Sequence, residues 1–347
     1  MFHIFFFCLL SGYLFSCLFY TKRTVVVARP LPFLPPKLST YQASVRFNIL
    51  DLAMKNGNGG NLQQLFQRLV GVICDVLQRL LFMVLSVGPI PNHIAFIMDG
   101  NRRYAKCRKL GPGAGHTAGF SSLIRVLECC YKIGVKYVTV YAFSIDNFKR
   151  DPSEVQSIMD LMLEKIDELL KEESIVNSHG IRINFFGNLK LLSEPVRMAA
   201  EKAMAATAKN TNVVFSVCVA YTSTNEIVHA VQESCKEKLA QVQVNSNVNG
   251  GIRDSFRGYT RLSEEEFSIT PGDLERHMYL AECPDPDLLI RTSGETRLSN
   301  FLLWQTTFCY LYVLDALWPE ISPWWLGWVI LHYQRAKPCI AKRKALL

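Results

Sequence analysis

The stretch that decides the fold is Ile-Ala-Phe-Ile-Met-Asp-Gly-Asn-Arg-Arg-Tyr, residues 94–104. Its first five residues are apolar and predict a buried strand, which ends at Asp99, where glycine and asparagine replace bulky side chains. Arg102 and Arg103 follow, and guanidinium groups have a fork geometry that matches phosphate oxygens. The pattern predicts a carboxylate beside permanent positive charge at a strand-to-helix turn.

One acid among bases at such a turn suggests a site for a metal diphosphate. Asp99 would hold Mg²⁺, which favours one or two carboxylates together with substrate phosphates. Gly100 would let a ligand approach the main chain closely. Asp-Gly-Asn is also ordinary turn chemistry, so the motif taken alone fits a simple turn as well as a binding site.

A second polar stretch follows another short apolar segment. Residues 288–291 predict a strand that leads into Arg-Thr-Ser-Gly-Glu-Thr-Arg-Leu-Ser-Asn, residues 291–300. Arg291, Arg297 and Ser299 bring two guanidinium groups and a hydroxyl into one short loop, a composition typical of an anion-binding site. Two such sites predict two phosphorylated substrates.

Apolar segments alternate with helical patterns along most of the chain. The expected strands are residues 94–98, 137–143, 181–186, 213–220, 288–291 and 310–314. This alternation favours an α/β fold, with a central, mostly parallel sheet of about six strands flanked by helices. Asp99, Ser144 and Arg291 all follow strand ends, where open α/β sheets place their ligands.

Helix signals lie between these strands. The expected helices are residues 116–133, a segment after Asp151, residues 193–208, a segment from Ser223 to about Ala240, and a short helix opening at Thr270. Asp151 and Glu154 predict a capping box around Pro152. His116 at a helix start would donate to a phosphate, although a lone histidine is more often structural. Residues 244–265 lack periodicity and predict a surface loop.

The 347-residue chain divides by composition into four parts: an apolar anchor and flexible linker at 1–60, an amphipathic helix at 61–90, the α/β domain at 91–335 and a basic tail at 336–347. Positive charge follows the apolar start, which places the remainder of the chain in the cytosol. A cleaved targeting segment, or translation starting at Met54, fits equally well. The helix at 61–90 would lie on a membrane or over a lipid channel, or pack on the core.

Residues 93–103, 141–150 and 290–304 closely resemble the cis-prenyltransferases, the family of undecaprenyl and dehydrodolichyl diphosphate synthases. The match spans about residues 91–319 and looks most like the eukaryotic dehydrodolichyl branch. It implies condensation of isopentenyl diphosphate with an allylic diphosphate, such as farnesyl diphosphate, to extend a polyprenyl chain, as in dolichol biosynthesis. It also implies an apolar tunnel walled by the helix at 116–133 and the helix after Asp151.

The resemblance assigns roles to individual residues in the catalytic domain. At the allylic site it implies Asp99 with Mg²⁺, Gly100, Asn101, Arg102, Arg103, Arg150 and His116, with Tyr104 and Ser144 as further substrate contacts. Arg291, Arg297 and Ser299 would hold isopentenyl diphosphate. Asn147 would assist proton removal or position the substrate, since an amide is a poor base, or the departing diphosphate would take the proton.

Three departures from the bacterial pattern matter, and the last of them points to a partner. Tyr310 replaces a metal-associated glutamate, Pro112 replaces an arginine, and the C-terminal Arg-x-Gly clamp is absent. Losing such a clamp costs about 2 kcal/mol of binding or more. In eukaryotic relatives a partner resembling the Nogo-B receptor supplies it. The resemblance therefore implies the catalytic subunit of a heteromer at the endoplasmic reticulum membrane, with its catalytic domain in the cytosol.

The alternative is a non-catalytic scaffold or receptor subunit of the same fold, although a scaffold has no reason to keep both anion-binding motifs.

Other classes of protein are disfavoured. A trans-prenyltransferase is disfavoured because the chain has no Asp-Asp pair, and a haloacid-type phosphatase is disfavoured because Asn101 stands where a second aspartate is required. The net charge of +8 does not predict nucleic-acid binding, because basic residues cluster at two strand ends. Eleven cysteines without a Cys-x-x-Cys pair fit a reduced compartment.

Overall fold

The computed structural model describes residues 60–111, 113–249 and 268–346. The expected anchor and linker lie outside the described residues, apart from Gly60. The four-part division of the chain therefore stays a prediction.

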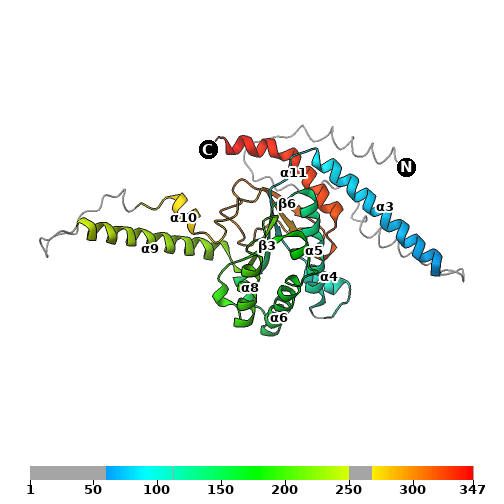
Figure 1. Ribbon diagram of the computed structural model, residues 1–347, viewed down its shortest axis with the longest axis horizontal. Helices are drawn as coiled ribbons and strands as arrows, with labels where there is room; N and C mark the ends of the chain where they lie inside the picture. The colour runs from blue at the N-terminus through cyan, green and yellow to red at the C-terminus, as the bar shows by residue number, and fades with distance from the viewer. Residues whose placement is uncertain (1–59, 112, 250–267, 347) are drawn as a thin grey trace.

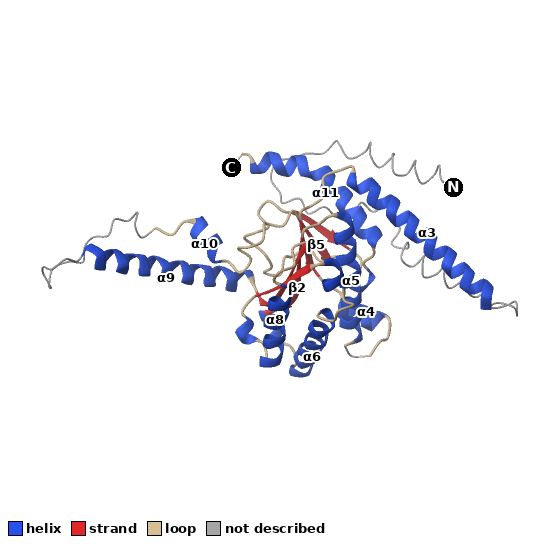
Figure 2. Ribbon diagram, in the orientation of Figure 1, coloured by secondary structure: helices blue, strands red, loops and turns tan. Residues whose placement is uncertain are grey.

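Six strands form one sheet in the order β3-β4-β2-β1-β5-β6, and every pairing is parallel. The strands are β1 (His93–Ile97), β2 (Tyr137–Ser144), β3 (Ile181–Phe186), β4 (Val213–Tyr221), β5 (Leu288–Thr292) and β6 (Tyr310–Leu314). Figure 2 shows the sheet at the centre of the molecule, with helices around it. The predicted α/β fold is confirmed. The apolar runs form strands because both faces of a parallel sheet are buried.

β1 lies in the middle of the sheet, between β2 and β5. Ile97 at its end pairs with Tyr141 of β2 on one side and with Arg291 of β5 on the other. Parallel strands end at the same edge of a sheet, so the polar residues that follow β1, β2 and β5 are neighbours. This register places the expected site at one edge.

The helices are α3 (Gly60–Ser86), α4 (Asn101–Cys107), α5 (Ala114–Ile133), α6 (Pro152–Leu169), α7 (Ile175–His179), α8 (Glu194–Thr207), α9 (Ser223–Asn249), α10 (Pro271–His277) and α11 (Pro323–Lys344), with 3₁₀ turns η1 (Ile145–Lys149), η2 (Leu189–Leu191) and η3 (Trp318–Glu320). Residues of α5, α6, α8 and α11 build the larger apolar cluster with the sheet. A smaller cluster contains Ile97, Tyr221 and Phe301. The expected helix starting near His116 begins two residues earlier, at Ala114.

The helix α3 has two different faces. One face packs on the core: a Cβ added to Gly327 of α11 would lie 2.8 Å from Leu81, and Gln334 Nε2 donates to Leu85 O at 2.7 Å. Exposed apolar side chains on α3 are Leu69, Val72, Ile73, Val76, Leu77, Leu80, Met83 and Val84. The segment Arg68–Ser86 is long and apolar enough to cross a membrane, with a mean hydropathy of 1.9. Core packing is confirmed for one face only.

The helix α9 continues beyond its expected end near Ala240 and runs to Asn249, so the loop predicted at 244–265 is wrong for residues 244–249. Residues 250–267 lie outside the described part of the chain. Asn and Val are weak helix formers, but extending an existing helix requires no new nucleus. α9 extends away from the sheet, with α10 beside it (Figure 1). His277 Nε2 and Glu237 Oε2, 2.8 Å apart, link the two helices.

His93 at the start of β1 is buried as a neutral ring. Its Nδ1 lies 2.5 Å from Pro284 O, and its Nε2 lies 2.7 Å from Thr139 Oγ1. Burial lowers the pKa of His93 to about 4, although the Pro284 carbonyl and Asp287 favour the protonated form. The unfolded chain therefore binds a proton at a higher pH than the folded chain does.

Stability should consequently fall as the pH drops from about 6.5 towards 4. At pH 5 the His93 contribution to the free energy of unfolding should be about 2 kcal/mol smaller than at pH 7. Urea unfolding of wild type and His93→Gln at both pH values measures it. The variant should lose less stability than wild type on acidification. An equal loss in the two proteins would contradict this role of His93.

Candidate active site

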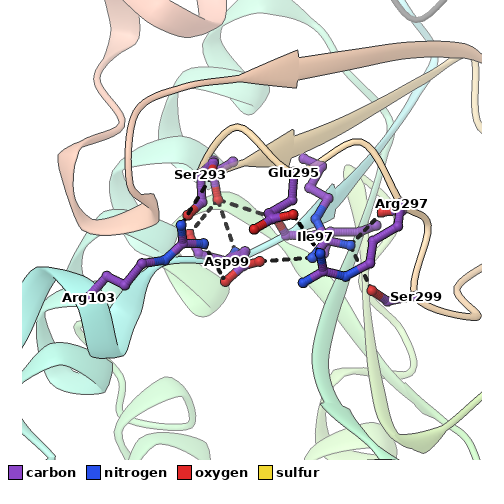
Figure 3. A network of polar contacts seen from close by, with 9 residues as sticks. Ile97, Asp99, Arg103, Ser293, Glu295, Arg297 and Ser299 are labelled. Atoms are coloured by element: carbon purple, nitrogen blue, oxygen red, sulfur yellow. Dashed lines mark hydrogen bonds and ion pairs between the residues drawn. The ribbon is translucent and has the colours of Figure 1, made fainter.

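Asp99 is held by its main chain at the junction of β1 and β5. Its N–H donates to Thr292 Oγ1 at 2.9 Å, and Thr292 Oγ1 lies 2.7 Å from Asp99 O. Trp318 N also donates to Asp99 O at 3.0 Å. The carboxylate is thereby fixed next to the end of β5, as Figure 3 shows.

Both carboxylate oxygens of Asp99 face arginines. Arg291 Nη2 donates to Oδ2 at 2.8 Å, and Arg103 Nη2 lies 3.4 Å from Oδ1. Burial opposes ionisation of Asp99, but the hydrogen bond and charge of Arg291, together with the charge of Arg103, hold its pKa below the usual range. Asp99 is therefore an anion at neutral pH.

Arg291 is a buried guanidinium in a fixed orientation. Its Nη1 donates to Arg297 O and, at 2.7 Å, to Ser299 Oγ. Its side chain is 6% exposed, and its Nε has no hydrogen-bond partner among the described residues. The guanidinium therefore keeps unused donors beside Asp99. Arg297 contributes its carbonyl, whereas its own guanidinium pairs with Glu295 and is largely exposed.

The start of α4 is packed too closely for larger residues. Gly100 has a φ of 109°, and a Cβ there would lie 2.9 Å from a Leu317 side-chain atom. A Cβ on Gly119 of α5 would lie 2.4 Å from Asn101 Oδ1. One turn later Tyr104 faces Arg108, whose guanidinium carbon lies 5.6 Å from the ring centroid. Gly100 and Asn101 therefore lie beside Asp99, whereas the Tyr104 ring contacts another side chain.

Arg102, Arg150 and His116 form a second basic group around Glu154. Glu154 Oε1 accepts from Arg150 Nη1 at 3.0 Å and lies 3.6 Å from Arg102 Nη1. Burial and the nearby arginines lower the pKa of His116, while Glu154 acts in the opposite direction. His116 is therefore neutral at neutral pH and able to donate one hydrogen bond.

The prediction that Glu154 completes a capping box is wrong. Asp151 caps α6 by accepting from Ser153 N at 2.9 Å, and Pro152 opens the helix as expected. Glu154 instead pairs with arginines on either side of the site. Sequence reasoning missed this role, although the four-residue spacing between Arg150 and Glu154 was an available signal.

Ser144 and Asn147 hold the turn after β2. Ser144 Oγ accepts from Asp146 N at 3.1 Å, and Asn147 Oδ1 accepts from Ser144 N at 3.0 Å. The amide oxygen of Asn147 is therefore occupied by the main chain. This contact favours a positioning role for Asn147 over a role as a base.

Tyr310 lies away from Asp99. It begins β6 and pairs with Leu288 at the start of β5, at the opposite end of the sheet from Arg291. Its ring is buried, with the Tyr333 ring centroid 6.4 Å away. The immediate surroundings of Asp99 therefore do not depend on Tyr310. Pro112 lies outside the described residues.

Buried polar atoms without partners mark the centre of the site. In the described part of the chain, Arg291 Nε, Ser293 Oγ and Asn101 Oδ1 lack hydrogen bonds, and such atoms normally bind a ligand or water. Among all the residues that the structure describes, no group of three or more His, Cys, Asp or Glu side chains could hold a metal ion. One ionised carboxylate fits Mg²⁺ when substrate oxygens complete the ligand set.

α5 and α6 present apolar side chains beside this site. Phe120 and Ile124 of α5, and Ile158 and Met162 of α6, are partly buried against the main core. Lys165 of α6 lies over the Phe120 ring, with Nζ 5.3 Å from its centroid, so the two helices face each other. The apolar tunnel expected between them stays a prediction.

Comparisons with known proteins agree with this geometry. The family model described as "Putative undecaprenyl diphosphate synthase" matches residues 97–339. Dehydrodolichyl diphosphate synthase CPT3 of Solanum lycopersicum is 58% identical over 271 residues, which cover 77% of this chain and 93% of that protein. The dehydrodolichyl diphosphate synthase complex subunit DHDDS of Homo sapiens is 40% identical over 268 residues, covering 77% of this chain and 74% of that protein.

Among solved structures, lavandulyl diphosphate synthase from Lavandula x intermedia, in complex with dimethylallyl diphosphate, has a TM-score of 0.60 and 29% identity. The match covers 71% of this chain and 95% of that one. These similarities confirm the resemblance and the fold. The chain is thus a prenyltransferase that belongs to the undecaprenyl diphosphate synthase family of cis-prenyltransferases.

Proposed function

We propose that this enzyme condenses isopentenyl diphosphate with an allylic diphosphate, such as farnesyl diphosphate, and makes a long-chain polyprenyl diphosphate of the dolichol type. The observation that carries this proposal is the 2.8 Å contact between Asp99 and Arg291, which joins two anion-binding segments at neighbouring strand ends. The printed names of the relatives, dehydrodolichyl diphosphate synthases, support the product class.

The allylic diphosphate would lie between the start of α4 and the second basic group, which surrounds Glu154. Its phosphate oxygens would be bound by Arg102, Arg150 and neutral His116. At Gly100 and Asn101 the diphosphate would come close to the protein main chain. Breaking the allylic C–O bond leaves a carbocation and a diphosphate, so fixed positive charge favours this step. Glu154, whose Oε1 contacts both Arg102 and Arg150, would hold the two guanidinium groups together and offset their repulsion before substrate arrives.

Isopentenyl diphosphate would bind at Arg291. Arg297, whose guanidinium is exposed, would leave Glu295 for a phosphate, and the unpaired but buried Nε–H of Arg291 and hydroxyl of Ser293 would become donors after local rearrangement. Asn147 would hold the turn between the substrates, and the proton released on condensation would pass to the departing diphosphate.

Asp99 would hold Mg²⁺ together with diphosphate oxygens. The ion would supply charge neutralisation for the leaving group. The carboxylate suits this role because it is ionised and about a third exposed, at 29% for the side chain. Arg103, the more exposed and more distant of its two partners, is the one placed to move aside.

Replacing Asp99 with Asn should lower isopentenyl transfer to farnesyl diphosphate by about 100-fold or more, because the variant keeps the shape of the side chain without its charge. Radiolabelled isopentenyl diphosphate with Mg²⁺ and the full-length chain, assayed with its partner, gives the rate. Asp160→Asn, at an exposed α6 position, is the matched control. Wild-type turnover by Asp99→Asn would reject the metal assignment.

The active species is proposed to be a heteromer with a subunit resembling the Nogo-B receptor. α11 ends at Lys344, and its last turn carries three basic residues, Lys342, Arg343 and Lys344. The human relative's name, a complex subunit, supports a partner.

Adding such a partner to the purified chain should raise kcat/KM about 10-fold or more, since one arginine–phosphate clamp contributes roughly 1.5–3 kcal/mol. Titrating partner into a fixed amount of chain should give saturable activation. Full activity of the chain alone, unchanged by the partner, would contradict the heteromer.

The enzyme is proposed to act at the cytosolic face of the endoplasmic reticulum membrane, with the exposed apolar face of α3 against the bilayer. A helix with one apolar face free fits an interfacial position, because burying that face in lipid removes it from water.

Val76→Glu combined with Leu80→Glu, in the chain that starts at Met54 and so lacks the expected anchor, should reduce flotation with phospholipid vesicles several-fold, because charge disfavours insertion into lipid. Met198→Glu, at an exposed apolar position on α8, serves as the control. If the α3 variant floats as well as wild type, the contact between α3 and the bilayer is disproved.

A further inference from the structure

The loop after β5 has an unusual backbone. Ser293, Ser299, Asn300 and Leu302 all have positive φ values, of 82°, 49°, 58° and 46°. Residues other than glycine adopt this region at a cost in energy, so the conformation persists only where neighbouring groups hold it. Because the same loop carries Ser299, its shape fixes one acceptor of Arg291.

Tyr141 of β2 holds this loop by two contacts. Its ring stacks on Phe301, with centroids 4.5 Å apart and planes 10° from parallel. Its hydroxyl donates to Tyr221 O at 3.1 Å and, at a longer 3.4 Å, to Ser299 O. Burial raises the pKa of Tyr141 to about 12, so the hydroxyl remains a donor at neutral pH.

The far side of the loop is anchored separately. Asn300 Oδ1 accepts from Thr224 N and from Thr224 Oγ1, both at 3.1 Å, and Asn300 O accepts from Ser223 N at 2.8 Å. Tyr141 is therefore the contact that ties the loop to β2. Ser299 Oγ, the next polar atom, accepts from Arg291 Nη1 at 2.7 Å.

Tyr141 also belongs to the other half of the site. It lies on β2 three residues before Ser144, where the strand ends. Ser144 begins the turn that carries Asn147 and Arg150. Tyr141 thus stands on the strand that leads into the allylic turn, while its side chain contacts the loop that orients Arg291.

We propose that Tyr141 is a positioning residue that sets the place of Arg291 relative to the allylic site and so controls affinity for isopentenyl diphosphate. It acts through the Ser299 loop and does not itself contact substrate. The inference rests on the proposed function, because it assigns isopentenyl diphosphate to Arg291.

Tyr141→Phe keeps the ring and removes the hydroxyl. It should raise KM for isopentenyl diphosphate about 5- to 20-fold, while KM for farnesyl diphosphate changes less than twofold and kcat less than threefold. Tyr137→Phe, on the same strand but at its start, is the matched control and should behave as wild type. The midpoint of thermal unfolding is measured for each variant.

A double-mutant cycle separates positioning from general stability. Ser299→Ala should raise the same KM, and Tyr141→Phe should add little to Ser299→Ala. Phe301→Leu removes the stacked ring and keeps the Tyr141 hydroxyl. It should also raise KM for isopentenyl diphosphate more than KM for farnesyl diphosphate, and it replaces Tyr141→Phe if that variant fails to fold.

An equal rise in both KM values, full additivity in the cycle, or wild-type kinetics in Tyr141→Phe would each overturn the positioning role. Absence of isopentenyl transfer by wild type with its partner would instead reject the proposed function. The two failures are therefore distinguishable.

Discussion

The ion pair between Asp99 and Arg291 is the contact on which the site depends. It joins the central strand β1 to β5, and it is largely shielded from water on the arginine side. A carboxylate and a guanidinium at hydrogen-bond distance neutralise each other, which lets both remain charged in a partly buried place. In the proposed function, Arg291 exchanges this partner for a substrate oxygen and Asp99 exchanges it for a metal ion.

The fold produces this pair through strand order. Parallel strands bring their carboxyl ends to one edge, and β1 between β2 and β5 places three polar segments there. Thr292 and Trp318 fix the main chain of Asp99, and the Ser299 loop fixes Arg291. Precision in the site therefore comes from main-chain hydrogen bonds and packed rings as well as from the charged residues.

The sequence predicted the elements and the two basic segments because their signals are local. Short apolar runs mark strands, and Asp99 and Arg291 follow such runs directly, each with a glycine one to three residues later. The partners of individual side chains could not be predicted, because they depend on which strands become neighbours. Glu154 has the spacing of a cap but binds two arginines, Arg297 uses its carbonyl, and Asn147 is held by Ser144. The extent of α9 was underestimated for a different reason, the low helix propensity of its last residues.

The pairing of β1 with β5 also sets an order of events during synthesis. Asp99 and Arg291 are 192 residues apart, and the long insertion between them contains three of the six strands. Strands that are so distant in sequence pair late, because the intervening chain must be made and ordered first. α3 leaves the ribosome well before Arg291 is translated. The nascent protein therefore exposes the helix that we propose lies against the bilayer long before the two halves of its active site can meet.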